Sequence, residues 1–573
     1  MQRIEVATLL RGPEARAALT DGTFIAAWTE LHRHSPHATA FQAPAFACAW
    51  YSAYAEEWEP VIVITSRDGR GGLVGLWALA YRAADWTLVH VGAHQAEYHA
   101  WLAQPSEDAA FLATAWTAIR RDLPFRRLQC KYLPAPHLAD TLAVALGRNR
   151  VAFRRHARPL AWLDTEDIRA SFAKKSNKSR FNRLKRLGAL EFRRITQREE
   201  LEAALDALID FYDFRQGAVN RSVPFREDPR KRAFHLALFE AAGEDLVFTA
   251  TLLDGHPIAG FWGLASGAMA HLGMLIHSPF LAEHSPGKLH VMQLSERLLE
   301  QGRTALDLTP GGDAWKERFA NDHDEVAEAL LYASSMIRLR EAVLESMGRA
   351  ARNLLSWVRI TPAQARTAVA LLSKASPARV LRKLRAWAGE NREFRVYRAD
   401  RALARRHAAD PGVRCNDLAD LLLFQPCESW QSRDSFLSAA LERLEQGQSA
   451  FTISLEGKLA HCGWMAAQSE SRMSEVEQTL AFPEGSVALY DYYTPPSFRG
   501  RGLDRTAIGH MLWAAFQRAE TRYAYISVLA DNGPSRHVIE GLGFELQGVF
   551  HWRRRFGQIT KWADAFPEEA GDA

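Results

Sequence analysis

Three similar passages recur along the chain, and their spacing constrains its fold more than any other feature. They are VIVITSRDGRGGLVGLWALAYR (61–82), LVFTATLLDGHPIAGFWGLASG (246–267) and FTISLEGKLAHCGWMAAQ (451–468). Each has an apolar run with β-branched residues, then a charged residue beside Gly, then a second apolar run. This pattern predicts a β-hairpin, because Asp-Gly turns supply the positive φ that tight hairpins need. Gly75, Gly260 and Gly463 in the second strands predict a bulge or a close backbone approach.

The turns lie about 190 to 200 residues apart, which is far beyond the repeat length of a solenoid. A chain of 573 residues is also too long for one hydrophobic core. Its composition, 47% apolar and 24% charged, is that of globular domains. We therefore predict three domains of related architecture.

A strand, a loop, a helix and a second strand follow two of the three hairpins. After the second hairpin they read AHLGMLIH, SPFLAEHSPGK, LHVMQLSERLLEQG and TALDLT, and after the third SVALYDYYT, PPSFRGRGLD, RTAIGHMLWAAFQRAE and YAYISVLA. Such crossover units predict mixed sheets of the α+β (α/β) class. The first hairpin precedes a helix-like AAFLATAWTAIRRD and a strand RRLQCKYL, but its entry loop lacks a glycine cradle. We expect that copy to keep the fold without the site.

Composition and charge indicate no specialised function class. The net charge of +4 and pI near 8.7 do not demand nucleic acid, and no apolar run reaches the length of a membrane span. The amino terminus has no signal-peptide h-region, so we expect a soluble, cytoplasmic protein. His spacing indicates no metal site. The cysteines form no CxxC pair, and reduced, mostly buried thiols are expected at Cys48, Cys130, Cys415, Cys427 and Cys462.

Two basic runs interrupt this pattern. Residues 341–394 are rich in Arg and Lys with apolar residues at helical spacing, which predicts a basic helical linker. KKSNKSRFNRLKRL (174–187) is the second run. Each is either a solvated helix face or a surface for a membrane, RNA or an acidic polymer.

The stretch SFRGRGLD (497–504) follows a strand and precedes a helix. Gly500 and Gly502 allow a sharp turn that exposes successive N–H groups, and the helix presents its positive end to an anion. A further element, Asn532-Gly533-Pro534-Ser535, opens a helix after the next strand. This pair of features predicts a pyrophosphate cradle.

The same two features resemble the GNAT family of acyl-CoA N-acyltransferases. Its phosphate loop is matched by Arg499-Gly500-Arg501-Gly502-Leu503, and its later Asn-x-x-Ser signature by Asn532 and Ser535. The resemblance covers a predicted domain at 395–565 and implies acyl-CoA held between two central strands. It assigns donor contacts to Tyr492 and Thr494 as well as to the loop.

The resemblance also implies catalytic roles. Asp491 is the implied base that removes the proton of the attacking amine, and Tyr493 is a candidate acid for the leaving thiolate. Two positions depart from the family pattern: Asp504 stands where Gly or Ala is usual, which would place a carboxylate near the phosphates, and Ile539 replaces the usual Tyr acid. Either Tyr493 or His537 serves instead, or the thiolate leaves unaided, or the domain binds CoA without efficient turnover.

Residues 40–335 resemble the CelD-type acyltransferases of bacterial cellulose and exopolysaccharide synthesis, themselves GNAT-like and similar in layout to Fem-type aminoacyl transferases. The motifs that carry the match include FQAPAFACAW, FYDFRQG, Ser285-Pro286-Gly287-Lys288-Leu289, Leu306-Asp307-Leu308 and Trp315-Lys316. Ser285, Gly287 and Lys288 are the expected cofactor contacts in this copy. Arg215, Asp307 and Lys316 are the expected substrate contacts.

Together these patterns predict a degenerate GNAT-like domain at 1–155, a CelD-type domain at 156–340, the basic linker and the C-terminal GNAT domain. The predicted function is transfer of an acyl group, most simply from acetyl-CoA, to an amine or hydroxyl of a sugar, sugar nucleotide or polysaccharide precursor, without a metal. Exopolysaccharide biosynthesis proteins are expected partners. Two alternatives stay open: a Fem-like transferase that uses aminoacyl-tRNA, and a non-catalytic CoA-binding partner of a polysaccharide synthase.

Overall fold

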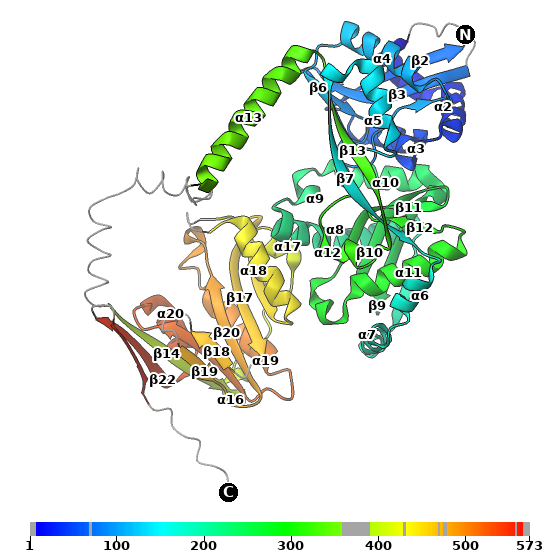
Figure 1. Cartoon of the computed structure of the whole chain (residues 1–573). Helices are drawn as coiled ribbons and strands as arrows, with labels where there is room; N and C mark the ends of the chain where they lie inside the picture. Colours follow the sequence, from blue (N-terminus) through cyan, green and yellow to red (C-terminus); the bar gives the residue numbers. More distant parts are fainter. Residues whose placement is uncertain are drawn as a thin grey trace. The chain divides into compact units, whose positions relative to one another are not determined.

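The computed structural model describes residues 7–67, 72–357, 390–427, 431–467, 470–473, 478–555 and 558–564. It divides into two compact units (Figure 1). The first consists of Met1–Ile209, Pro224–Ser278 and His284–Leu354, and the second of Asp210–Val223, Pro279–Glu283 and Leu355–Ala573.

The first unit begins with an antiparallel sheet in the order β1-β2-β3-β4, with β5 also paired to β3. Its strands are β1 (Thr8–Arg11), β2 (Glu59–Arg67), β3 (Gly72–Arg82), β4 (Thr87–His90) and β5 (Leu102–Ala103). The helices are α1 (Pro13–Thr20), α2 (Gly22–His34), α3 (Pro44–Ala53), α4 (Asp108–Asp122) and α5 (His137–Leu146). The described strands of this sheet contain no parallel pair. The predicted hairpin of the first copy is β2–β3; its turn, Asp68-Gly69, lies outside the described residues.

The rest of the first unit is built on an eight-stranded sheet in the order β6-β13-β7-β12-β11-β10-β9-β8. Its strands are β6 (Arg127–Leu133), β7 (Val151–Trp162), β8 (Leu190–Arg194), β9 (Leu246–Leu253), β10 (His256–Ser266), β11 (Met269–His277), β12 (Ala305–Asp307) and β13 (Asp322–Tyr332). The accompanying helices are α6 (Glu166–Phe172), α7 (Lys175–Lys185), α8 (Arg198–Asn220), α9 (Pro224–Glu227), α10 (Arg230–Ala242), α11 (Pro286–Glu300), α12 (Ala314–Glu317) and α13 (Ser335–Trp357). From Asp210 onward, α8 groups with the second unit.

The second unit has an eight-stranded sheet in the order β15-β16-β17-β20-β21-β14-β22-β23. Its strands are β14 (Glu390–Asp400), β15 (Arg414–Cys415), β16 (Ser449–Leu455), β17 (Lys458–Ala467), β20 (Ser486–Tyr493), β21 (Tyr523–Leu529), β22 (Glu545–Arg555) and β23 (Gln558–Ala563), while β18 (Glu470–Met473) pairs with β19 (Gln478–Ala481). The helices are α16 (Arg401–Ala404), α17 (Leu418–Leu421), α18 (Arg433–Glu445), α19 (Leu503–Ala515) and α20 (Gly533–Gly541).

Seven strands of each eight-stranded sheet have the same topology. The edge strand differs, because β6 precedes the other strands of its sheet in the chain whereas β23 follows those of its own. In both, the only parallel pair among the described strands joins the strands on either side of a crossover helix: β11 and β12 around α11, and β20 and β21 around α19. In both, a strand from the start of the domain, β7 or β14, inserts next to that pair and is antiparallel to its neighbours. The predicted α+β class with mixed sheets is therefore confirmed.

The hairpin prediction holds in detail. Asp254 and Gly255 have φ values of 50° and 82°, and Glu456 and Gly457 have φ values of 54° and 69°. Positive φ at both central residues is what a two-residue hairpin turn of type I′ requires. The groups nearest the three second-strand glycines are side chains, not the backbone that the sequence predicted. A Cβ would lie 2.3 Å from Phe111 at Gly75, 2.9 Å from Leu208 at Gly260 and 2.9 Å from Tyr492 at Gly463.

Other expectations have mixed outcomes. All five cysteines are free; Cys130 and Cys462 are buried, whereas Cys415 and Cys427 are exposed. The basic linker begins as the helix α13, and residues 358–389 lie outside the described residues. The predicted boundary at 155/156 falls inside β7, a strand of the eight-stranded sheet, and the domain boundaries stay predictions.

Candidate functional site

The parallel strands of each eight-stranded sheet separate at the same point. In the second unit, β20 and β21 pair as far as Leu489 and Ile526, after which β20 continues alongside β17 only. In the first unit, β11 and β12 pair as far as His271 and Asp307. A ligand that lies between two central strands, as the GNAT resemblance implies, enters at such a point.

Asp491 lies on a bulge of β20, two residues beyond the separation. The pairing of β17 with β20 shifts between Cys462 and Trp464, and Asp491 has a φ of 52°. A non-glycine residue in this region costs about 1 to 3 kcal/mol, and such strain collects at functional sites. The Asp491 carboxylate is 56% exposed and lies 2.6 Å from the Arg443 guanidinium.

Arg443 holds this carboxylate from α18. Its guanidinium lies 5.0 Å from the ring centroid of the buried Trp464 and 5.3 Å from that of Tyr490. Beside the pair is a cavity of about 270 Å³, lined by Gln431, Ser435, Phe436, Ala439, Ala440, Arg443, Cys462, Trp464, Asp491, Tyr492 and Tyr493. The candidate base therefore borders a cavity and has a fixed orientation.

The loop before α19 has the geometry of an anion cradle. Gly500 and Gly502 each have a φ of 76°, and a Cβ at either position would meet nothing within 4 Å. No side chain caps the helix at Gly502, so its first N–H groups stay available. Arg499 and Arg501 are exposed beside them, and the Arg499 Nε donates to the Thr494 carbonyl oxygen at 3.1 Å.

Asp504 does not face this cradle freely, because its carboxylate is bound to neighbouring side chains. Oδ1 accepts a hydrogen bond from the Thr494 hydroxyl at 2.7 Å and lies 2.9 Å from Nδ1 of the buried His461. The hydrogen bond from His461 is the main cause that lowers the pKa of Asp504; partial burial opposes it and Thr494 reinforces it. The departure from the family pattern at this position thus joins α19 to β17.

Replacing Asp504 with Ala is expected to destabilise the protein by about 1 to 3 kcal/mol, because the Thr494 hydroxyl loses its acceptor and the buried His461 Nδ1 keeps only the Thr494 hydroxyl oxygen, 2.9 Å away, as a partner. Because its pKa is lowered in the folded state, the ionised Asp504 stabilises the fold above about pH 4, and this contribution is lost as the pH falls below that value. The loss of unfolding free energy caused by Asp504→Ala should therefore become smaller in acid. Urea denaturation at several pH values measures this. Asp531→Ala, which removes an exposed carboxylate, is the control; an equal effect of both variants would contradict the prediction.

The tyrosines next to Asp491 on β20, Tyr492 and Tyr493, differ in their surroundings. Tyr492 packs against Gly463, and its buried hydroxyl has no hydrogen-bond partner among the described residues. The Tyr493 hydroxyl donates to the Gln425 carbonyl oxygen at 3.2 Å. Ile539, at the position of the usual Tyr acid, is a buried core residue. The catalytic acid therefore stays unassigned.

Asn532 and Ser535 form a helix cap. The Asn532 side chain accepts from the Ser535 backbone N–H at 3.3 Å at the start of α20. This arrangement is the expected one for an Asn that opens a helix. Their predicted contact with the cofactor stays a prediction.

In the first unit the equivalent loop is packed rather than open. Ser285 has a φ of 53° before α11, and a Cβ at Gly287 would lie 2.7 Å from the His277 ring. The Lys288 ammonium donates to the Asn177 Oδ1 at 2.7 Å. Burial, and then the charges of Arg180, Lys174 and Arg318, lower the pKa of Lys288. Four cationic side chains therefore gather at the start of α11.

Asp307 is the centre of a buried polar cluster. Its carboxylate is fully buried and accepts from the Tyr98 hydroxyl at 2.5 Å, the His271 Nδ1 at 2.9 Å and the Thr309 backbone N–H at 2.8 Å. Arg158 lies 3.6 Å away. The predicted substrate contact is thus occupied by protein groups. Residue spacing carries no signal for Tyr98, Arg158 and His271, because they come from distant parts of the sequence.

The remaining predicted substrate contacts also have protein partners. Buried Lys316 lies 3.3 Å from the Thr309 carbonyl oxygen, the Thr309 hydroxyl and the Pro310 carbonyl oxygen. It therefore fixes the loop after β12. Arg215, on the part of α8 that groups with the second unit, pairs with Glu445 of α18 at 2.5 Å. Whether either side chain contacts substrate stays a prediction.

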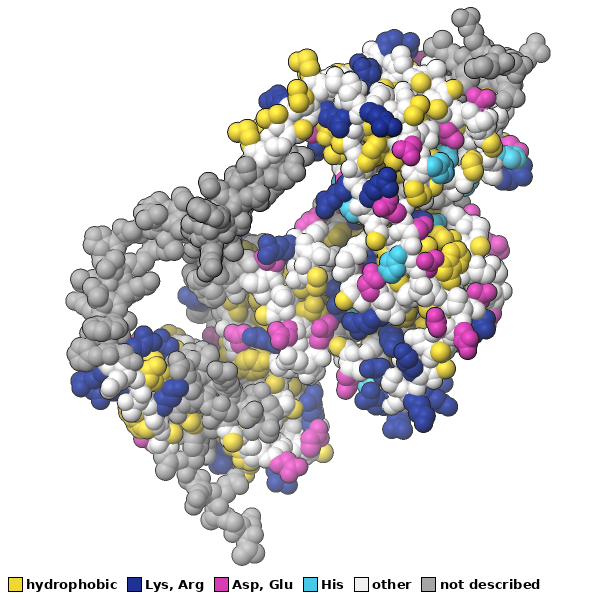
Figure 2. Space-filling model, in the orientation of Figure 1, with side chains coloured by type: hydrophobic (Ala, Val, Ile, Leu, Met, Phe, Trp, Pro, Cys, Tyr) yellow, Lys and Arg dark blue, Asp and Glu magenta, His cyan; other side chains and the backbone are white. Residues whose placement is uncertain are grey.

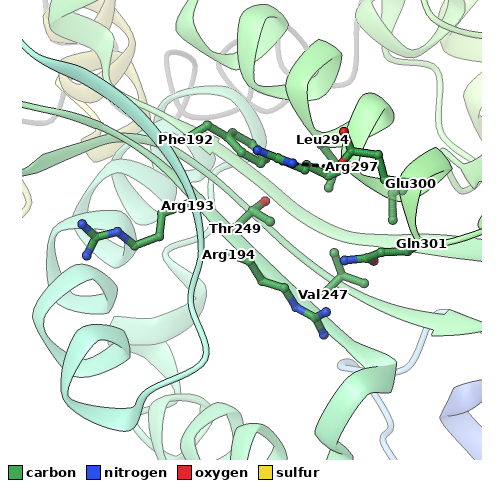
Figure 3. Close-up of a pocket in the computed structure, with 10 residues that line it drawn as sticks. Phe192, Arg193, Arg194, Val247, Thr249, Leu294, Arg297, Glu300 and Gln301 are labelled. Atoms are coloured by element: carbon green, nitrogen blue, oxygen red, sulfur yellow. Dashed lines mark hydrogen bonds and ion pairs between the residues drawn. The ribbon is translucent and has the colours of Figure 1, made fainter.

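A second cavity, of about 360 Å³, was not anticipated from the sequence. It lies in the first unit between β8, β9 and the C-terminal half of α11 (Figure 3). Val247, Leu294 and Leu298 form its apolar wall, and Arg194 and Arg297 border it, with Arg297 paired to Glu300. The Arg193 side chain points away from the cavity and pairs with Glu191 and Glu200 (Figure 3). None of the predicted site residues lines this cavity.

Family models match the chain in two places. Residues 171–317 match the model described as acetyltransferase (GNAT) domain, and residues 415–544 match acetyltransferase (GNAT) family. The chain carries two GNAT acetyltransferase domains. These domains support acyl transfer as the general activity and imply the use of acyl-CoA. These matches do not test the narrower resemblance to CelD-type acyltransferases, which stays a prediction.

Solved structures give looser likenesses. A FemX structure is 12% identical, with a TM-score of 0.40 over 55% of this chain and 98% of its own. L-PGS from Bacillus licheniformis is 11% identical, with a TM-score of 0.35 over 56% and 96%. A tandem GNAT protein from the clavulanic acid biosynthesis pathway is 14% identical, with a TM-score of 0.20 over 65% and 99%. At these scores they decide neither fold nor activity. No curated protein sequence matched.

The described part of the chain shows neither a metal-binding cluster nor a membrane-spanning helix. No group of three or more His, Cys, Asp or Glu residues there is arranged to hold a metal ion. Nor do the described helices include one with the length and apolar character of a membrane span.

Proposed function

We propose that the protein is an acyl-CoA-dependent N- or O-acyltransferase whose C-terminal GNAT domain binds the donor. The observation that carries this proposal is the loop at Gly500 and Gly502, with both glycines at positive φ and open space where side chains would be. This loop connects β20, one of the two strands that separate, to α19. The equivalent loop of the first unit is filled by His277 against Gly287, which favours the C-terminal copy as the donor site.

In the proposed reaction, the acceptor amine or hydroxyl attacks the thioester carbonyl carbon directly. The Asp491 carboxylate takes the proton of the attacking group, and the CoA thiolate leaves. The backbone N–H groups of Gly500 to Leu503, with Arg499 and Arg501, hold the pyrophosphate. Arg443 keeps Asp491 in place.

For the acceptor we propose a sugar, sugar nucleotide or polysaccharide precursor. The CelD-type resemblance supports this class. The cationic side chains of Lys174, Arg180, Lys288 and Arg318 in the first unit suit the phosphates of a sugar nucleotide.

A Fem-like transfer from aminoacyl-tRNA is the second candidate, and α7 favours it. Lys174, Lys175, Lys178, Arg183, Lys185 and Arg186 are exposed on and beside this helix, and residues 168–187 contain no acidic side chain. Figure 2 shows Lys and Arg gathered where Figure 1 labels α7. Binding to tRNA would then weaken steeply with salt, because each neutralised phosphate releases counterions.

An assay of free thiol release separates these functions. The proposed function predicts CoA release from acetyl-CoA that depends on an added amino sugar or sugar nucleotide. Release that no acceptor stimulates, together with retained CoA binding, would indicate a non-catalytic binding partner of a synthase. Salt-sensitive tRNA binding without use of acetyl-CoA would favour the Fem-like reaction.

A further inference from the structure

The cavity of about 360 Å³ in the first unit lies against the edge of the eight-stranded sheet (Figure 3). The edge strand β8 pairs with β9, and in that register Arg194 stands directly opposite Thr249. Side chains of directly opposed residues lie on the same face of a sheet, with Cβ atoms about 4.5 to 5.5 Å apart. Val247 shares this face, because it lies two residues from Thr249 along β9. The sheet therefore presents a cation, a hydroxyl and an apolar side chain to the cavity.

The C-terminal half of α11 supplies the other wall. Leu294 and Leu298 lie four residues apart on one face of this helix, and both are buried against the cavity, as is Val247. Small-molecule pockets have volumes of about 300 to 1,000 Å³ and are mostly apolar, with a few polar groups that orient the ligand. This cavity therefore fits a small molecule whose body is apolar.

Arg194 provides a positive charge that the protein does not neutralise. Its Nη2 donates to the carbonyl oxygens of Glu244 at 3.3 Å and Leu246 at 3.2 Å, which holds the side chain in place. In the described part of the chain no carboxylate pairs with Arg194. Arg297, by contrast, pairs with Glu300 at 2.7 Å. Arg194 is therefore the cation at this cavity that favours an anionic ligand.

Thr249 offers a second polar contact through its bond to a buried histidine. Thr249 is 2% exposed, and its Oγ1 lies 3.0 Å from Nε2 of His290, whose Nδ1 lies 2.8 Å from the Thr251 Oγ1. Burial lowers the pKa of His290 to about 3, so the ring is neutral and carries one N–H. In the tautomer with this N–H on Nε2, His290 donates to Thr249 and accepts from Thr251. The Thr249 O–H is then available to donate to a ligand.

We propose that this cavity binds a small apolar carboxylate, such as the anion of a short fatty acid. The carboxylate oxygens accept from the Arg194 guanidinium and the Thr249 hydroxyl, and the hydrocarbon packs against Val247, Leu294 and Leu298. A phosphate alone would leave the apolar walls uncovered, and an uncharged hydrocarbon would leave Arg194 without an anion. The site is separate from the proposed donor site, which lies in the second unit.

NMR titration of hexanoate with the full-length protein, observed on the ligand signals and without acetyl-CoA, tests the proposal. Arg194→Gln should weaken hexanoate binding by at least about tenfold, as loss of a charge-assisted contact implies. Arg193→Gln is the matched control, because Arg193 is the next residue on β8, points away from the cavity and pairs with Glu191 and Glu200. Its affinity should equal that of wild type. Hexan-1-ol, which has the same chain without the charge, should bind wild type at least about tenfold more weakly than hexanoate.

Three results would overturn the proposal. One is the absence of hexanoate binding to wild type at millimolar concentration. Another is equal binding by Arg194→Gln and Arg193→Gln, which would place hexanoate elsewhere on the protein. The third is equal affinity of wild type for hexanoate and hexan-1-ol, which needs no variant and would show a pocket without anion recognition. Arg194→Lys keeps the charge and should bind hexanoate more tightly than Arg194→Gln, and circular dichroism should show the wild-type fold in each variant.

Discussion

Replacing Asp491 with Asn is expected to lower kcat for acyl transfer by about 100- to 10,000-fold, the usual contribution of a positioned proton acceptor. Asn keeps the size of the side chain and removes its ability to take a proton. The left-handed backbone at this position also tolerates Asn well. The dissociation constant for acetyl-CoA should stay within a few fold of wild type, because the pyrophosphate is assigned to the loop before α19.

Steady-state rates of thiol release, with calorimetry for binding, measure this effect. Glu442→Gln is the matched control, because Glu442 is an exposed carboxylate next to Arg443 on α18. Its kcat should equal that of wild type. An Asp491→Asn enzyme with normal kcat would remove Asp491 from the reaction and transfer the role of base to another group.

Replacing Asp307 with Ala is expected to destabilise the first unit by about 3 to 5 kcal/mol, the usual result of breaking a buried ionic cluster. The variant leaves the Tyr98 hydroxyl, the His271 ring and the Thr309 N–H without their acceptor, and it leaves Arg158 with Asp324 alone as an acidic partner. Urea denaturation should show this loss. Asp313→Ala, which removes an exposed carboxylate on the following loop, should change stability by less than about 1 kcal/mol.

The Asp307 cluster also predicts a pH dependence. Burial alone would raise the pKa of Asp307, but the hydrogen bond and charge of His271, with Arg158 and Tyr98, outweigh it and lower the pKa. A lowered pKa in the folded state stabilises the fold above the unfolded value of about 4 and loses that contribution as pH falls. The difference in the free energy of unfolding between wild type and Asp307→Ala should therefore become smaller in acid. A variant that is as stable as Asp313→Ala, yet fails to bind acceptor, would instead support the predicted substrate contact.

Local patterns predicted what depends on local physics. The hairpin turns at Asp254 and Glu456 and the glycine loop before α19 follow from residues close together in sequence, because turn geometry and helix starts are local. The sequence also indicated the crossover strands. It did not show that β7 and β14 insert next to the parallel pair, because both strands precede their domains' hairpins by many residues.

The features that the sequence did not predict depend on strand register and on side-chain packing. Leu489 and Ile526 end the parallel pairing in the second unit, where His271 and Asp307 end it in the first. Only this register shows that one copy has a buried polar cluster where the other has core residues. Similarly, Gly287 appears in the sequence as a flexible phosphate contact, whereas the structure shows it packed against His277.

The most direct test of the donor site is calorimetric titration of acetyl-CoA into wild type, Gly502→Glu and Gly447→Glu. Both glycines have positive φ and open surroundings, so the two variants carry a similar backbone strain. Only Gly502 lies in the loop before α19, where Glu would place a negative charge beside the pyrophosphate. Wild type and Gly447→Glu should bind alike, with Gly502→Glu weaker by at least about tenfold, as loss of a charge-assisted contact implies. Equal binding by all three proteins, or no binding by wild type, would contradict a donor site at this loop.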